Sequence, residues 1–150
     1  MKNFFEVSNR RGLLDRLDGL RPDAAHLWGK MDVAQMCAHC AIALEVAAGD
    51  VPKTQAFIGK VLAPFVKKKF LHGTEPLSKN SPTDPTFVVS DSRDFAREKA
   101  RLVEIAKRFG EAGAAAADGR VHSFFGRLTG EEWGVLMYKH LDHHLRQFGA

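Results

Sequence analysis

The amino-acid sequence predicts an all-α protein, an up-and-down four-helix bundle that forms a single domain over residues 1–150. Three observations lead to this prediction. Several segments carry apolar residues at helical spacing, and two segments open on the capping-box pattern that starts many helices. No stretch of useful length alternates between apolar and polar residues, as a half-buried strand would. A chain of 150 residues is also long enough to enclose one core without disulfides.

Two helices are predicted in the first third of the chain. Leucines recur at helical spacing over residues 13–20 and predict a short first helix, which Arg21-Pro22 should end. Asp32 is a plausible N-cap, and Gln35 follows three residues later as in a capping box. These residues predict a second helix over residues 33–48.

A third helix is expected over residues 54–71, although Pro64 lies inside it and should kink or divide it. It carries the apolar residues Phe57, Ile58, Val61, Leu62, Phe65 and Val66. A long loop over residues 72–91 should separate this helix from the next main helix, because the segment holds three prolines and no convincing period. Loops of this length are uncommon in compact domains and are often functional. Residues 87–89 could form a short extended piece within it.

Helical spacing returns in the last third of the chain. A helix that begins near Phe95 should stop at Gly110 or Gly113, with the alanine-rich residues 114–117 as a connector. Thr129 and Glu132 then form a second capping box. The last helix should therefore run from about residue 130 to about residue 148.

Composition excludes several classes of protein. Apolar residues make up 45% and charged residues 27% of the chain, a balance typical of globular proteins. No apolar run approaches the roughly 18 residues of a membrane span, and charges interrupt the N-terminal apolar residues where a signal peptide would need none. We therefore expect a cytoplasmic protein with no membrane partner. The net charge of +4 is modest, so we do not expect a nucleic-acid partner; the run Lys67-Lys68-Lys69 is more often a solvated helix end than a binding patch.

The segment Cys37-Ala38-His39-Cys40 contains a C-x-x-C pattern, which invites a redox or zinc interpretation. Redox pairs usually lie at a helix start, where the helix dipole lowers the thiol pKa, whereas this pair lies in the middle of a predicted helix. A helical wheel also turns Cys37 away from His39. We interpret both cysteines as small core or interface residues, in keeping with a reducing compartment.

Three histidines are candidate metal ligands. A helical wheel places His140 and His144 on the inner face of the last helix, one turn apart, so that both rings can reach one metal ion. The second helix turns His39 inward, and His143 lies at the edge of the inner arc. Three histidines with an open fourth position could activate water or a thiol. The wheel places three residues on the outer face: Lys139, Asp142 and Arg146.

The same residues allow other interpretations. Three inward histidines could form a hydrogen-bonded polar network with Tyr138 or Asp32 instead of a metal site. His122 could reach the mouth of the site as a catalytic acid, a base or a substrate contact, or it could be a packing and turn feature. Gln147 could orient a metal ligand through a hydrogen bond, or it could be only a polar helix end.

The segment "VAQMCAHCAIALE" together with the terminal "HLDHH" resembles the DinB/YfiT-like superfamily of metal-dependent proteins. The segments "HSFFGRLTGEEWGVLMYKHLDHHLRQFG" and "PLSKNSPTDPTFVV" resemble its branch of domains of unknown function. The resemblance extends from Trp28 onward. It implies a four-helix bundle that often forms homodimers and holds nickel or zinc through His39, His140 and His144. His143 matches no ligand of the family.

Characterised members of the superfamily include transferases and isomerases that depend on low-molecular-weight thiols. The resemblance therefore implies a divalent-metal enzyme, a hydrolase or a thiol-dependent transferase or isomerase, with a small-molecule substrate or thiol as its partner. The alternative is a non-enzymatic bundle that binds a ligand or dimerises, with a structural or vestigial metal site. The alternative is supported by the lack of a clear nucleophile or general base at a fixed distance from the three histidines.

Overall fold

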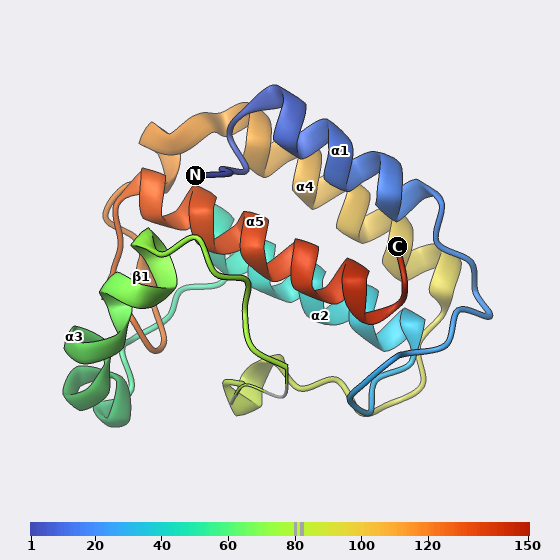
Figure 1. Ribbon diagram of the computed structural model, residues 1–150, viewed down its shortest axis with the longest axis horizontal. Coiled ribbons are helices and arrows are strands. Elements are labelled where there is room, and N and C mark those ends of the chain that lie inside the picture. The colour runs from blue at the N-terminus through green and yellow to red at the C-terminus, as the bar shows by residue number, and fades with distance from the viewer. Residues whose placement is uncertain (80, 82) are drawn as a thin grey trace.

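The computed structural model describes residues 1–79, 81 and 83–150, and it is mostly helical (Figure 1). In chain order its elements are α1 (Val7–Asp18), α2 (Val33–Ala48), α3 (Phe57–His72), the 3-10 helix η1 (Pro85–Phe87), α4 (Phe95–Ala117), β1 (Val121–His122), β2 (Gly126–Arg127) and α5 (Gly130–Gln147). Asn80 and Pro82 belong to the predicted long loop and lie outside the described residues. The prediction of a predominantly helical protein is confirmed, with a small antiparallel sheet in addition.

Four helices surround the hydrophobic core. α2 contacts α4 and α5, and α1 contacts α4 and α5 in turn. Figure 1 shows α5 alongside α2, with α1 and α4 above them and α3 set apart at the lower left. α2 is apolar on nearly every side, which suits a helix that packs against two neighbours. Among the described residues, no helix is long and apolar enough to span a bilayer.

The helix starts follow local hydrogen bonding. The Asp32 carboxylate accepts a hydrogen bond from the Gln35 N–H at 2.8 Å, and the Gln35 amide oxygen accepts one from the Asp32 N–H at 2.9 Å. Thr129 and Glu132 exchange the equivalent pair of bonds at the start of α5. Both predicted capping boxes are confirmed, because each depends only on residues three positions apart.

The segment between α4 and α5 differs from the prediction. Gly113 interrupts α4 with a φ of 78°, as expected of a glycine stop, but residues 114–117 resume a helical turn instead of forming a plain connector. A hairpin then follows, in which Val121 pairs with Arg127 and His122 with Gly126. Strands of two residues are too short to show a period of two in the sequence, so this hairpin was not predicted.

α3 begins at Phe57, three residues later than predicted, and continues through Pro64 to His72 without being divided. It contacts α5 and β2 and lies outside the group of four packed helices. Most of the apolar residues that identify this helix in the sequence are exposed to solvent. Helical spacing therefore predicts the helix itself correctly, but it does not predict which neighbour, if any, covers its apolar face.

The loop after α3 contains the short helix η1 and returns to the core. Phe87 and Val89 are buried, at 7% and 5% exposure, and Val88 between them has extended backbone angles. The predicted extended piece at residues 87–89 is thus only partly present, since Phe87 itself ends η1. This loop brings the Phe87 carbonyl next to α2.

Two features of α5 bear on the predicted outer face. Asp142 pairs with Arg146, one helical turn away, at 2.9 Å, and also with Arg16 of α1 at 2.7 Å. Lys139 is not on an outer face, because the C-terminal end of α3 packs over its side chain. Its ammonium group donates hydrogen bonds to the Phe70 and Gly73 carbonyls at 2.9 and 2.6 Å, and the residue is 7% exposed.

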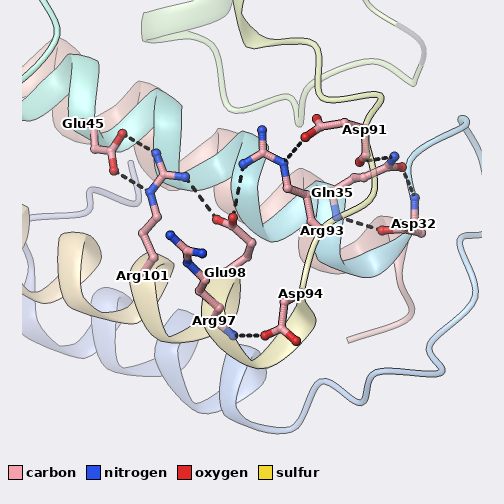
Figure 2. A network of polar contacts seen from close by, with 9 residues as sticks. All are labelled: Asp32, Gln35, Glu45, Asp91, Arg93, Asp94, Arg97, Glu98 and Arg101. Atoms are coloured by element: carbon pink, nitrogen blue, oxygen red, sulfur yellow. Dashed lines mark hydrogen bonds and ion pairs between the residues drawn. The ribbon is translucent and has the colours of Figure 1, made fainter.

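A charged network joins α2 to α4, as Figure 2 shows. Glu98 is 5% exposed, and its two carboxylate oxygens pair with Arg93 at 3.2 Å and with Arg101 at 3.1 Å. Arg101 also forms a bidentate pair with Glu45 at 2.7 and 2.8 Å. Since a buried carboxylate needs such partners, this network fixes how α4 lies along α2.

Candidate metal centre

Three histidines from two helices meet in the interior. The nearest ring nitrogens of His39, His140 and His144 all lie within 4.8 Å of one another. His39 comes from α2, and the other two come from adjacent turns of α5. The Nε2 atoms of His39 and His140 are 3.0 Å apart, and the His144 ring centroid is 4.7 Å from that of each of the other two. The structure therefore brings together the three residues that the sequence singles out, in a group that could hold a metal ion.

The protonation of His39 follows from its hydrogen bond. Its Nδ1 lies 2.8 Å from the Phe87 carbonyl oxygen, and a carbonyl only accepts hydrogen bonds. Nδ1 must therefore carry the proton, which leaves the Nε2 lone pair directed at His140. Metal-bound histidines typically donate their other ring N–H to a carbonyl or carboxylate in this way.

His144 is held in the same manner by a side chain. Its Nδ1 lies 2.7 Å from the Gln147 amide oxygen, and the Gln147 amide nitrogen donates to the Trp28 carbonyl at 2.7 Å. Because Trp28 offers an acceptor, the amide nitrogen of Gln147 must face it and the amide oxygen must face His144. Of the two roles considered for Gln147, the structure shows a hydrogen bond to His144, which leaves the Nε2 lone pair of His144 free.

The three rings are in the form that binds metal. Burial lowers the pKa of His39, of His140 and, to about 3, of His144, and neighbouring histidines lower the pKa of each further. Neutral imidazole is the form that ligates metal ions. At neutral pH the group therefore presents uncharged nitrogen donors without first losing protons from charged rings.

Replacing Gln147 with leucine should weaken metal affinity about 10- to 100-fold, the usual cost of losing a group that orients a ligand. The physical reason is that His144 loses the acceptor that fixes its proton on Nδ1. Competition against a chromophoric chelator measures this change. Gln35→Leu is the matched control, because Gln35 is in the helix of His39 but bonds to the helix cap and not to a histidine. An equal loss of metal affinity in both variants would contradict the role of Gln147.

His143 lies outside this group of three, in agreement with its position at the edge of the wheel. Its Nδ1 is 3.2 Å from the Leu77 carbonyl oxygen. Its ring packs edge to face with the Trp28 ring, with 5.5 Å between the ring centroids. Trp28 lies over this end of α5, and the Lys79 ammonium group lies 4.5 Å from its ring centre. His143 therefore connects α5 to the loop that covers it.

His122 lies in β1, and its ring contacts Trp133 at 5.5 Å and Phe125 at 5.1 Å between centroids. Its Nδ1 accepts hydrogen bonds from the backbone N–H groups of Phe124 and Phe125 at 3.0 and 3.1 Å. With Nδ1 an acceptor, the proton of the neutral ring is on Nε2. His122 thus builds the hairpin turn, and the group it can offer to a ligand is an Nε2–H donor, not a base.

Burial lowers the pKa of His122 from 6.5 to about 4. In the unfolded chain His122 binds a proton below about pH 6.5, whereas in the folded chain it binds one only below about pH 4. The free energy of unfolding should therefore fall as the pH is lowered from about 6.5 to about 4. Urea titrations of the wild type and of His122→Gln at about pH 7 and about pH 5 measure the effect. We expect the wild type to lose more stability on acidification than the variant; an identical loss in both would show that this ring does not stay neutral.

The two cysteines are buried and free. Burial raises the pKa of Cys37 to about 12 and that of Cys40 well above its usual range. Since the thiolate is both the nucleophile and the metal ligand, neither side chain is prepared for redox or zinc chemistry at neutral pH. Their interpretation as small core residues is confirmed by their burial, with Cys40 Sγ 3.8 Å from Met36 Sδ.

Sequence reasoning missed the backbone groups of the site. The Phe87 carbonyl and the Trp28 carbonyl both complete the hydrogen bonding of the histidines, directly or through Gln147. Neither carries a sequence signal, because every residue has a carbonyl and only the fold of the loops brings these two close. Asp32 was one of the two residues that could have joined the histidines in a polar network. Its carboxylate instead accepts the capping hydrogen bond at the start of α2.

Comparison with known proteins gives one match. A family model described as "Protein of unknown function (DUF1569)" matches residues 5–150. No curated protein matches the chain, and no solved structure does. The match includes both helices that supply the three histidines. The chain therefore belongs to the DUF1569 family.

Proposed function

We propose that this protein binds a divalent metal ion through the Nε2 atoms of His39, His140 and His144 and uses it as a Lewis acid on a small molecule. The observation that carries the proposal is the pair of Nδ1–H hydrogen bonds at His39 and His144. These bonds leave the Nε2 lone pairs of both rings free, in a group whose nearest ring nitrogens lie within 4.8 Å of one another.

The number of ligands supports catalysis over a structural role. Structural zinc sites usually have four protein ligands, whereas catalytic sites have three and keep a position for water or substrate. A bound metal would lower the pKa of a water or thiol in that position or polarise a substrate carbonyl. We therefore propose a hydrolase or a thiol-dependent transferase or isomerase. Nickel and zinc are the metals that the resemblance implies, and imidazole ligands suit both.

His122 is the residue we propose for substrate contact. It lies close enough to His140 to contribute to the lowered pKa of that ring, after burial and the nearer histidines. Its Nε2–H can donate to an oxygen of a substrate held at the metal, and its ring is held rigidly by the two backbone N–H groups. A neutral imidazole of lowered pKa is suited to hydrogen-bond donation, because it does not lose or gain protons near neutral pH.

The resemblance to the DinB/YfiT-like superfamily supports two further proposals. The packed group of α1, α2, α4 and α5 is proposed to be the four-helix bundle of that type, with α3 as an addition at its edge. A homodimer and a cytoplasmic location remain predictions from the sequence.

The proposal is tested on protein purified without a histidine tag. Elemental analysis should find nickel or zinc, or stoichiometric uptake when either metal is added. Cobalt(II) substitution then probes the open position, since a thiol that binds the metal adds a sulfur-to-metal absorption band. No uptake of nickel, zinc or cobalt would refute the metal site, and uptake without any response to thiols or other small ligands would favour a closed, structural site.

A second candidate is a metal-free polar network, which the 3.0 Å contact between the Nε2 atoms of His39 and His140 favours. In this arrangement His140 donates its Nε2–H to His39, and the cluster serves only to join α2 to α5. Thermal melts separate the two candidates, because a ligand that binds only the folded state raises the melting temperature further as its concentration increases. A melting temperature that does not respond to nickel or zinc supports the network.

A further inference from the structure

α3 presents a row of exposed apolar side chains, which we name the α3 apolar face. Phe57 and Phe65 are 81% and 82% exposed, and the residues between them on this face are 44% to 56% exposed. The face consists of Phe57, Ile58, Val61, Leu62 and Phe65. These positions recur at the spacing of adjacent helical turns and form one continuous strip. Contiguous exposed apolar surface of this kind usually marks a binding surface.

The residues on the opposite face of α3 explain why its apolar face is exposed. Gly59 and Ala63 are buried, one turn apart, and they are small. A Cβ at Gly59 would lie 2.3 Å from the Phe124 carbonyl oxygen, so only glycine permits this approach to the hairpin turn. The first turns of α3 thus pack on the protein through small residues, and their bulky residues are left outside, whereas Leu71 near the end of the helix is buried in the core.

Polar contacts hold α3 in this orientation. The Lys67 ammonium group pairs with the Glu132 carboxylate of α5 at 3.0 Å. Lys139 of α5 donates to the Phe70 and Gly73 carbonyls at the end of α3, where it also suits the negative end of the helix dipole. Because these contacts lie on the inner side, rolling the helix to bury its apolar face would break them.

The charged side chains of α3 itself and of the six residues before it all have one sign. Residues 51–74 contain five lysines and no aspartate or glutamate. Lys60, Lys68 and Lys69 are exposed, and their contacts with the described residues include no ion pair. On a helical wheel, Lys60 lies beyond one edge of the apolar strip, and Lys68 and Lys69 fall within its arc, at its C-terminal end.

We propose that the α3 apolar face docks on an anionic lipid membrane, with α3 lying in the plane of the interface. An amphipathic helix with phenylalanines on one face and lysines around it binds such surfaces by burying the apolar side chains among the acyl chains. The lysines reach outward to anionic headgroups, each contributing to the attraction. This contact is peripheral and requires no spanning helix.

The charges favour lipid over a second copy of the chain. In a symmetric dimer through this face, each copy would offer the same surface, rich in lysine and without a carboxylate within residues 51–74. An anionic membrane offers the opposite charge over its whole area. The proposal is independent of the metal site, which uses none of these residues.

The test is co-sedimentation of the full chain with vesicles of phosphatidylcholine alone and of phosphatidylcholine mixed with phosphatidylserine. We expect binding to the mixed vesicles that weakens as salt is raised. The double variant Lys68→Glu with Lys69→Glu should lower the partition coefficient by tens of fold, since each lysine near an anionic surface is worth roughly a fivefold factor. The double variant Phe57→Ser with Phe65→Ser should lose binding by a similar or larger factor, because both apolar anchors are removed.

Control variants carry single substitutions of the same two kinds, apolar to serine and lysine to glutamate, elsewhere on the surface. Val7→Ser removes an apolar side chain that is 70% exposed on α1, and Lys107→Glu reverses an exposed charge on α4. Both should bind vesicles like the wild type, and circular dichroism checks that every variant is folded. Absence of binding to the mixed vesicles, or binding that the α3 variants do not reduce, overturns the proposal. A dimer in analytical ultracentrifugation that Phe57→Ser with Phe65→Ser dissociates, without vesicle binding, would assign the face to a second copy.

Discussion

Replacing His144 with alanine is expected to abolish stoichiometric binding of nickel or zinc. His144 supplies one of the three converging nitrogens, and the two that remain, on His39 and His140, would hold a metal only weakly. Isothermal titration of the metal-free protein measures the loss. The chain should stay folded, since the lost ring leaves most of the core contacts of α5 in place.

The control for this experiment is the neighbouring residue. His143→Ala removes a histidine that is also 8% exposed and lies on the same turn, but whose ring points to Leu77 and Trp28. It should bind metal with the stoichiometry of the wild type. Equal binding by the wild type and by His144→Ala, or equal loss in both variants, would contradict the assignment of the ligands.

Replacing Trp133 with alanine is expected to lower the free energy of unfolding by about 3–5 kcal/mol, the usual cost of truncating a buried tryptophan or phenylalanine. Trp133 is fully buried, its ring contacts that of His122, and its indole N–H donates to the Arg120 carbonyl at 3.3 Å. Much of the stability of a domain of this size is then lost, since the total is about 5–15 kcal/mol. Urea denaturation followed by circular dichroism measures the change.

An aromatic residue of α3 provides the comparison. Phe65→Ala removes a ring that is 82% exposed, so it should change stability by no more than about 0.5 kcal/mol. A large loss in Phe65→Ala would mean that the α3 apolar face is buried in the folded protein. A small loss in Trp133→Ala would mean that the first turns of α5 do not pack as described.

Several parts of the fold could be predicted because their causes are local. The start of α2 at Val33 and the start of α5 at Gly130 follow from capping boxes within four residues of chain. The inward direction of His140 and His144 follows from helical geometry once the apolar residues of α5 are known. A break in α4 at Gly110 or Gly113 could be expected from the freedom of glycine to adopt a positive φ, and the structure has it at Gly113.

Other parts could not be predicted because they depend on contacts between distant segments. Lys139 looked like a solvated residue, and it is buried because α3, about 70 residues earlier in the chain, ends above it. The apolar spacing of α3 looks like that of a core helix, and only packing shows that its buried residues are Gly59, Ala63 and Leu71. The hairpin of β1 and β2 is too short to show any period.

By itself the sequence determined the helical class, the starts of α2 and α5 and the three candidate ligands, because helical periodicity and capping act over one or two turns. Only the tertiary structure decided that α2 and α5 lie close enough for His39 to meet His140 and His144. It also decided which carbonyls fix the protons of these rings and which face of α3 is left exposed. The physical reason is that a hydrogen bond or a packing contact between distant residues depends on how whole helices pack, which no local spacing encodes.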